Sequence, residues 1–341
     1  MRMKRQRLRA LILMCVIVAL IGTGAPAPTR AGGVNPFTGL PLDDAASQRR
    51  ALLIKVANTA NVRPQTGLSL ADVVVEHLSE GSITRFTALY LTHAPEKVGS
   101  VRSCRLIDLE LPQIFDAGLV CSGTSPGVQR LMRQSPAYLD GRTLVADLGR
   151  YSGCKGCPMY RTRDTGAPHN LFASAVNAWA VLEQRGKNQP SAFSAWRFDA
   201  DAPTAGIPVK SVDVPYRSGT VTWTYDAAAG VWKRSYGRTP HTERITRRQL
   251  AAANVIVVYA HHATTDIRED VGGARSIEIQ LWGQGLARVF RDGRMIDGNW
   301  RRPAQPGVLA FVDFAGNAIP LKPGNTWIEL VPLDFPVKAQ Q

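Results

Sequence analysis

Residues 50–57 read RALLIKVA, residues 70–80 read LADVVVEHLSE and residues 84–92 read TRFTALYLT. The first segment is a short, almost continuous apolar run, which is typical of a buried strand. The second is rich in valine, which favours a strand over a helix. The third alternates polar and apolar residues and follows the second after a short turn, so the two segments predict a β-hairpin. We therefore expect the N-terminal half to be built on a sheet that contains these three strands.

Strand and helix patterns alternate along the rest of this half. The expected elements are a short strand at 98–103, a helix at 107–115, a buried strand at 118–122, a helix through 129–134, and a helix that Asn170 caps and that runs to about Arg185. This alternation predicts an α/β arrangement for residues 49–185. A lead-in segment, 32–48, precedes it.

The second half has a different pattern. Residues 186–209 resemble a linker, and residues 210–335 predict a β-rich domain, either a sandwich or an open barrel, with one short helix near 246–252. The expected strands are 212–215, 221–225, 231–236, 255–260, 277–282, 286–290, 294–299, 308–312 and 326–330. The fold class expected for the whole chain is therefore α+β.

The N-terminus has the three parts of a secretory signal peptide: the basic MRMKRQRLR, the apolar ALILMCVIVALIG and the small-residue TGAPAPTRA. Cleavage fits after Ala27 or Ala31. The apolar run of 13 residues is shorter than the roughly 20 that a membrane span needs, which favours a cleaved leader over an uncleaved anchor. Cys15 lies in the middle of the run, where lipid attachment is not expected. Residues 1–31 thus predict a secreted or extracytoplasmic protein, tethered to a membrane only if the leader stays uncleaved.

The chain is basic, with a formal net charge of +14. Six of the basic residues lie in the leader, which has no acidic residue, so the rest of the chain carries about +8. A positive protein outside the cytoplasm is suited to anionic lipids, phosphate-bearing polymers or other phosphates. No run of five or more Lys and Arg residues with interleaved aromatics occurs, so we do not expect nucleic acid as a partner.

Four cysteines follow the leader: Cys104, Cys121, Cys154 and Cys157. An even number in an exported chain favours disulfides, and four cysteines allow three pairings. Cys104 and Cys121 lie at predicted strand ends, where a cross-strand disulfide fits. Cys154 and Cys157 form a CxxC motif that is read first as a structural disulfide, with a redox pair or half of a metal site as alternatives. No second CxxC completes a zinc tetrad, and neither a metal nor another cofactor is predicted.

Seven motifs give the chain a resemblance to a known family. They are NPFTGLP (35–41), RPQTGLSLADVVVEHLSEGSITRF (63–86), PEKVGSVRSCR (95–105), APHNLF (167–172), YDAAAGVWKRSYGRTPH (225–241), VFRDGRMIDGNW (289–300) and PGNTWIELVP (323–332). With them the chain resembles the YerB-like bacterial family of exported proteins and lipoproteins, a domain of unknown function with an N-terminal and a C-terminal half. Many relatives carry a lipid-anchor cysteine that is missing here, and Cys104 and Cys121 replace residues that are usually not cysteine. The resemblance supplies no activity.

Polar residues gather near strand ends of the N-terminal half and form the candidate ligand site. Arginine suits a phosphate because its planar fork donates two parallel hydrogen bonds, and the start of a helix offers free N–H groups. The alternative is a buried network of ion pairs that only holds the strand ends together. The candidate ligand-binding residues are Glu76, Glu80, Arg85, Arg102, Ser103, Arg105, Arg163, His169 and Asn170.

Other chemistries have weaker support. The GxVRSxR pattern at 99–105 is similar to that of cell-wall polymer transferases of the LytR–CpsA–Psr type, but their acidic metal-binding signature is not found. Ser125 lies in GTSPG rather than in a nucleophile elbow, so a loop or helix-cap role is expected for it. Neighbouring His261 and His262 are expected in a solvated loop. The tryptophans of the second half are expected in the core rather than on a glycan-stacking platform.

Three hypotheses follow. The first is a cell-envelope protein that binds an anionic ligand, such as an envelope polymer, a lipid-linked phosphate or a glycan. The second is an envelope enzyme, a transferase or hydrolase, acting on a phosphate-linked polymer or glycan through Arg102, Arg105, Glu80 and His169. The third is a non-catalytic structural protein with a buried ion network. No residue is assigned a catalytic role.

Overall fold

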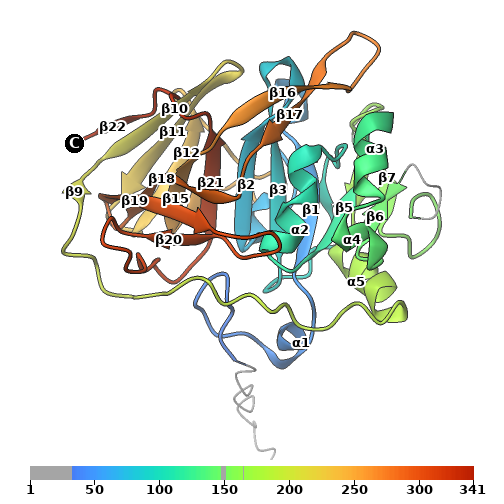
Figure 1. Cartoon of the computed structure of the whole chain (residues 1–341). Coiled ribbons are helices and arrows are strands. Elements are labelled where there is room, and N and C mark those ends of the chain that lie inside the picture. Colours follow the sequence, from blue (N-terminus) through green and yellow to red (C-terminus); the bar gives the residue numbers. More distant parts are fainter. Residues whose placement is uncertain (1–32, 147–150, 164) are drawn as a thin grey trace, which may run out of the picture. The chain divides into compact units, whose positions relative to one another are not determined.

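A mixed sheet of 11 strands runs through both halves of the chain (Figure 1). The computed structural model describes residues 33–146, 151–163 and 165–341, so the predicted leader lies outside the described residues. The strand order is β20-β19-β18-β15-β21-β2-β3-β1-β5-β6, and β9 pairs with β19. The bounds are β1 Leu52–Ala57, β2 Val73–Leu78, β3 Thr84–Tyr90, β5 Gly118–Cys121, β6 Thr143–Val145, β9 Ile207–Pro208, β15 Asn254–Tyr259, β18 Gly283–Arg291, β19 Arg294–Arg302, β20 Ala310–Val312 and β21 Thr326–Val331.

The two halves meet where β2 pairs with β21 in parallel, from Val73 opposite Thr326 to His77 opposite Leu330. The hairpin predicted from residues 70–92 is confirmed, because β2 pairs antiparallel with β3. β3 in turn pairs with β1. The structure is thus β-rich and mixed α+β, and the described residues form one compact unit.

A second sheet packs on one face of this large sheet. Its order is β13-β12-β11-β10-β22, with β14 beside β12. Trp223 and Trp232 of this sheet share one buried cluster with Phe86 and Trp327 of the large sheet, as expected for tryptophans in the core. The bounds are β10 Ser211–Tyr216, β11 Gly219–Asp226, β12 Val231–Tyr236, β13 Thr239–Pro240, β14 Ala251–Ala252 and β22 Lys338–Gln340.

The opposite face is covered by short helices and by irregular chain. Phe37 of the lead-in segment and Phe193 of the 186–209 segment stack in this second core, so both segments are part of the packed structure. Smaller elements complete the fold: α1 Asp44–Ser47, η1 Ala60–Val62, η2 Leu68–Leu70, η3 Glu80–Ser82, β4 Val98–Gly99, η4 Leu106–Leu109, α2 Leu111–Ile114, α3 Pro126–Met132, α4 Pro136–Leu139, β7 Met159–Arg161, β8 Leu171–Ala173, α5 Ala175–Gln184, β16 His262–Arg268 and β17 Arg275–Ile279.

Four local predictions are wrong. The helix expected from Asn170 begins only at α5, because residues 171–173 pair with β4 and β7 and Ser174 is the cap that accepts from Asn177 N at 3.2 Å. The strand expected at 98–103 is limited to β4.

The other two errors lie in the second half. Residues 246–252 are not a helix, because Glu243 accepts from two backbone N–H groups of the following turn and the chain then enters β14. The solvated loop expected at His261 and His262 is wrong for His262, which begins β16 and pairs with β17, whereas His261 precedes the strand and is exposed.

Both disulfides expected as the first interpretation are present: Cys104 with Cys121, and Cys154 with Cys157, at Cα–Cα distances of 5.7 and 5.2 Å. Within the described ranges, no helix combines the length and apolar character that crossing a bilayer requires.

Candidate functional site

Lys55 is the centre of a buried polar cluster on the face of the large sheet that η4 covers. Its Nζ donates to Asp108 Oδ1 at 2.8 Å and to Thr87 Oγ1 at 3.0 Å, and lies 2.5 Å from His77 Nε2. All of these side chains are buried. Burial lowers the pKa of Lys55 to about 8, although Asp108 opposes the shift. Burial and then the neighbouring Lys55 charge lower the pKa of His77 well below its usual value. The three ammonium donors therefore have three partners, and this cluster leaves no group for a ligand.

Glu80 follows β2 and bridges two of the predicted arginines. Arg85 Nη2 donates to Glu80 Oε1 at 2.5 Å, and Arg105 Nε donates to Glu80 Oε2 at 2.6 Å. Burial acts to raise the pKa of Glu80, but the hydrogen bond from Arg105 and the charges of both arginines lower it to about 2. Arg105 also faces the Glu269 carboxylate at 3.3 Å. The carboxylate between the two guanidinium groups is thus ionised over the whole physiological range.

Arg85 is held less completely than Arg105. Its Nη1 donates to the Ser103 carbonyl at 2.6 Å, but its buried Nε has no hydrogen-bond partner among the described residues. Burial, followed by the charge of Arg105, lowers the pKa of Arg85 to about 9. The Arg85 guanidinium is therefore buried, is ion-paired to Glu80, lies near the Arg105 charge and has one donor without a partner among the described residues.

Arg102 lies at the half-buried edge of this cluster. Its backbone N–H donates to the Lys55 carbonyl at 3.0 Å, which fixes its position on the sheet. Its side chain makes no hydrogen bond and no ion pair with any residue that the structure describes. Burial lowers the pKa of Arg102, and the Arg105 charge adds to this while Glu80 opposes it. The backbone of Arg102 is thus fixed on the sheet, and its guanidinium group has no ion-pair partner among the described residues.

His169 is also half-buried, and Arg102 lies close enough to affect its ionisation. Burial and then the Arg102 charge lower the pKa of His169, which keeps its ring neutral near pH 7. Its Nε2 lies 3.0 Å from Asn61 Nδ2, whereas the buried Nδ1 has no partner within the described part of the chain. Two hydroxyl groups, those of Ser100 and Thr165, donate to its carbonyl.

The remaining predicted residues have separate places. Glu76 is fully buried on the other face of the sheet, Asn170 accepts from Arg161 Nη1 at 2.6 Å, and Arg163 is exposed. Ser103 Oγ lies 3.5 Å from Ser122 Oγ. Of the nine predicted residues, the structure brings together Glu80, Arg85, Arg102, Ser103, Arg105 and His169.

Ser125 caps α3 by accepting from Val128 N, which is the cap role expected for it.

Glu76 belongs to a second buried network that the sequence did not reveal. Arg234 Nη2 donates to Glu76 Oε2 at 2.6 Å, and its Nη1 lies 2.5 Å from His241 Nδ1. Trp223 and Tyr216 both donate to oxygens of the Glu329 carboxyl group. Burial and the nearby Glu76 charge raise the pKa of Glu329 to about 8. These residues link β2 and β21 to the second sheet, so the network holds the two halves together.

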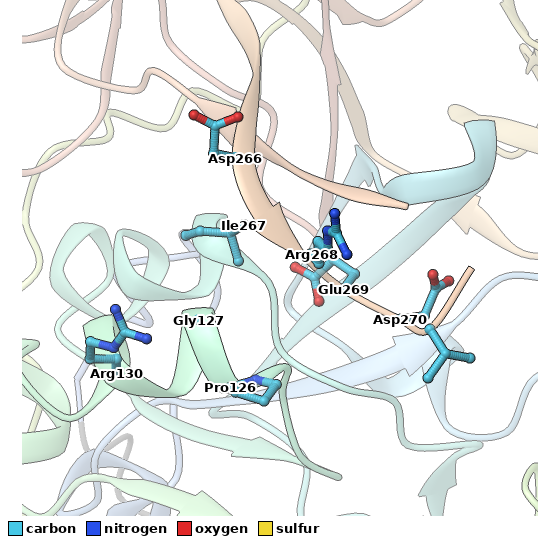
Figure 2. Close-up of a pocket in the computed structure, with 9 residues that line it drawn as sticks. Pro126, Gly127, Arg130, Asp266, Ile267, Arg268, Glu269 and Asp270 are labelled. Atoms are coloured by element: carbon cyan, nitrogen blue, oxygen red, sulfur yellow. The ribbon is translucent and has the colours of Figure 1, made fainter. Parts of the chain in front are cut away.

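A cavity of about 660 Å³ lies between α3 and the β16–β17 hairpin (Figure 2). Ile267 packs so closely on Gly127 that a Cβ there would lie 2.5 Å from it. The charged lining residues are Arg130, Arg268, Asp266, Glu269 and Asp270. Three carboxylates against two guanidinium groups make this cavity unsuited to an anion. Of the described residues that line it, Glu269 connects the cavity to the Arg105 cluster.

The fold and these networks define a two-part protein whose halves share one sheet. Family models describe it in the same two parts: residues 37–188 match the N-terminal domain, and residues 212–328 the C-terminal domain, of "Protein of unknown function (DUF3048)". The chain belongs to this family.

The relatives confirm the resemblance that the motifs predicted. The chain is 32% identical over 302 residues, 87% of its own length and 86% of the relative's, to the "Putative lipoprotein YerB" of Bacillus subtilis (strain 168). It is also similar to the crystal structure of the YerB protein from Bacillus subtilis, with a TM-score of 0.75 and 30% identity over 91% of this chain and 100% of that one.

Proposed function

We propose that this protein works outside the cytoplasm, at the cell envelope, and binds a phosphate-bearing anion at Arg102. The predicted leader supports the location, as does the relative described as a putative lipoprotein. Arg102 is the anion-binding residue of this proposal, and Arg85 and His169, whose ionisation the Arg102 charge influences, belong to its surroundings.

The unpaired Arg102 guanidinium is the observation that carries the proposal. It is half-buried, and no described residue hydrogen-bonds or ion-pairs with it. Partial burial weakens its hydration, and a partly desolvated cation gains most from an ionic partner. An anion at this position would restore the lost solvation.

The charges around Arg102 support the same assignment. Arg85, Arg102 and Arg105 contribute three positive charges, whereas Glu80 and Glu269 contribute two negative ones. Burial is the largest cause of the lowered pKa values of Arg85 and Arg102, and the Arg105 charge adds to it while Glu80 opposes it. The excess of one positive charge in the cluster attracts an anion. Guanidinium groups bind the oxygens of an anion such as phosphate in pairs, which favours a phosphate-bearing anion over a neutral glycan.

The buried clusters around Lys55 and Arg234 are not part of this site. Their charged side chains are fully buried and paired, and an already satisfied group has little to gain from a ligand. We assign them the structural role of the third hypothesis. That role and anion binding at Arg102 coexist in one molecule.

A thermal-shift titration with pyrophosphate tests the proposal, with sodium chloride of equal ionic strength as the reference. A ligand that binds only the folded state stabilises by about 2.7 kcal/mol at 100 times its Kd, so the melting temperature should rise. Arg102→Met should lose the rise, because it removes the free guanidinium while keeping a long apolar stem.

Arg133→Met is the matched control, since Arg133 is an exposed arginine at the end of α3. It should keep the shift of the unmodified protein. Equal shifts for the unmodified protein and Arg102→Met, or no shift beyond that of chloride, would show the proposal to be wrong.

A further inference from the structure

The CxxC motif forms an exposed disulfide in the loop before β7. Cys154 is exposed, whereas Cys157 is only 4% exposed. The motif therefore has one cysteine on the surface and one that is covered. This asymmetry matters because thiol–disulfide exchange begins with attack on an accessible sulfur.

The second disulfide of the molecule gives the contrast. Cys104 and Cys121 are both 0% exposed and belong to the hydrophobic core below the large sheet. An attacking thiolate cannot reach this bond without local unfolding. The two disulfides thus differ in access within one chain.

The surroundings of the exposed disulfide favour a thiolate. A cavity of about 480 Å³ is lined by both cysteines together with Lys155, Arg185 and Val181. Its charged lining residues are these two cations, and no carboxylate is among the described residues that line it. Neighbouring Lys and Arg side chains lower the pKa of a cysteine and so stabilise the thiolate that leaves in an exchange reaction.

The loop has supports that do not depend on the disulfide. Cys157 N donates to the Cys154 carbonyl at 3.2 Å, and Asn177 Nδ2 of α5 donates to the Cys157 carbonyl at 3.0 Å. The covered Cys157 is therefore held by α5 when the sulfur–sulfur bond opens. A bond that closes a loop of so few residues also contributes little chain entropy to stability.

We propose that Cys154–Cys157 is a redox-active disulfide that oxidises dithiols of other proteins outside the cytoplasm. A partner thiolate attacks the Cys154 sulfur, forming a mixed disulfide and releasing Cys157 as a thiolate. The second thiol of the partner loses its proton and attacks the partner sulfur of the mixed disulfide, which releases Cys154 as a thiolate. The partner loses two electrons and two protons and gains a disulfide, and the CxxC pair gains the two electrons.

Access is tested by exposing the folded protein to dithiothreitol, quenching with acid, and counting free thiols with a maleimide–polyethylene glycol gel shift under denaturing conditions. Two thiols per chain should appear at least 100-fold faster than the other two, and Cys154→Ser/Cys157→Ser should lack the fast pair. Equal rates for the two disulfides, or no fast pair, would overturn the proposal and leave the CxxC bond as a structural link.

The direction of attack is tested with single variants and glutathione disulfide. Cys157→Ser should form a glutathione adduct at Cys154 at least tenfold faster than Cys154→Ser forms one at Cys157, measured by mass spectrometry. Comparable rates would contradict the assignment of Cys154 as the attacked sulfur.

Oxidation is tested with a reduced peptide that carries two cysteines: the unmodified protein should convert it to its disulfide in stoichiometric amount, and Cys154→Ser/Cys157→Ser should not.

Discussion

Lys55 and Arg102 are neighbouring cations that differ in burial and in the number of partners that their charged groups have. The backbone N–H of Arg102 donates to the carbonyl of Lys55, yet the Lys55 ammonium is fully buried with three partners and the Arg102 guanidinium is half-buried with no hydrogen bond to a described residue. The difference shows that a cluster of charges is not by itself a binding site. The fold uses Lys55 for stability, whereas Arg102, which has no partner among the described residues, has charge to offer to a ligand.

The largest effect expected from this comparison is on the stability of Lys55→Met. The substitution leaves Asp108 buried without its cation, and breaking a buried pair on one side costs about 3–5 kcal/mol. Urea unfolding followed by circular dichroism measures the loss. A loss below about 1 kcal/mol would contradict the structural role, because surface substitutions already produce effects of about 0.5 kcal/mol.

Glu329, on the other face of the sheet, is a second buried ionisable group, and it makes the stability of the protein depend on pH. Burial and the Glu76 charge raise the pKa of Glu329 to about 8. Between about pH 5 and pH 8 the folded protein therefore keeps a proton on Glu329 that the unfolded chain has lost. Stability from this group is present at low pH and falls as the pH rises through the folded pKa. We expect Glu329→Gln to flatten the decline in unfolding free energy between about pH 5 and pH 8, by an amount on the order of a few kcal/mol. An unchanged pH profile would show that Glu329 is not protonated in the folded protein.

The smallest effect expected is on the stability of Arg102→Met. Because no hydrogen bond or ion pair of the described residues is lost, the free energy of unfolding should change by less than about 0.5 kcal/mol. The same urea experiment measures it beside Lys55→Met. A loss as large as that of Lys55→Met would place Arg102 among the structural charges.

The hairpin and most strands of the second half could be predicted because alternation and β-branched residues act locally. The site could be predicted only in part. Glu76 and His77 are neighbours in β2, but successive side chains of a strand point to opposite faces, so Glu76 joins Arg234 while His77 joins Lys55. Glu80 lies beyond the strand end, after the alternation has stopped, and joins the cluster that contains Arg105.

Long-range partners could not be predicted from one sequence. Arg234 lies 158 residues from Glu76, and nothing in the local pattern of either strand indicates which side chain it meets. The same limit applies to Arg102. Its residue type and its place beside a strand end indicated an anion site, but the lack of a partner among the described residues, which distinguishes it from Arg105, is a property of the folded chain.

A crystal structure of the protein soaked with pyrophosphate is the most direct test of the central claim. The account predicts electron density for the anion within hydrogen-bond distance of the Arg102 guanidinium, with the Lys55 and Arg234 clusters unchanged. Density that is absent at Arg102, or that is the same in Arg102→Met crystals, would contradict it.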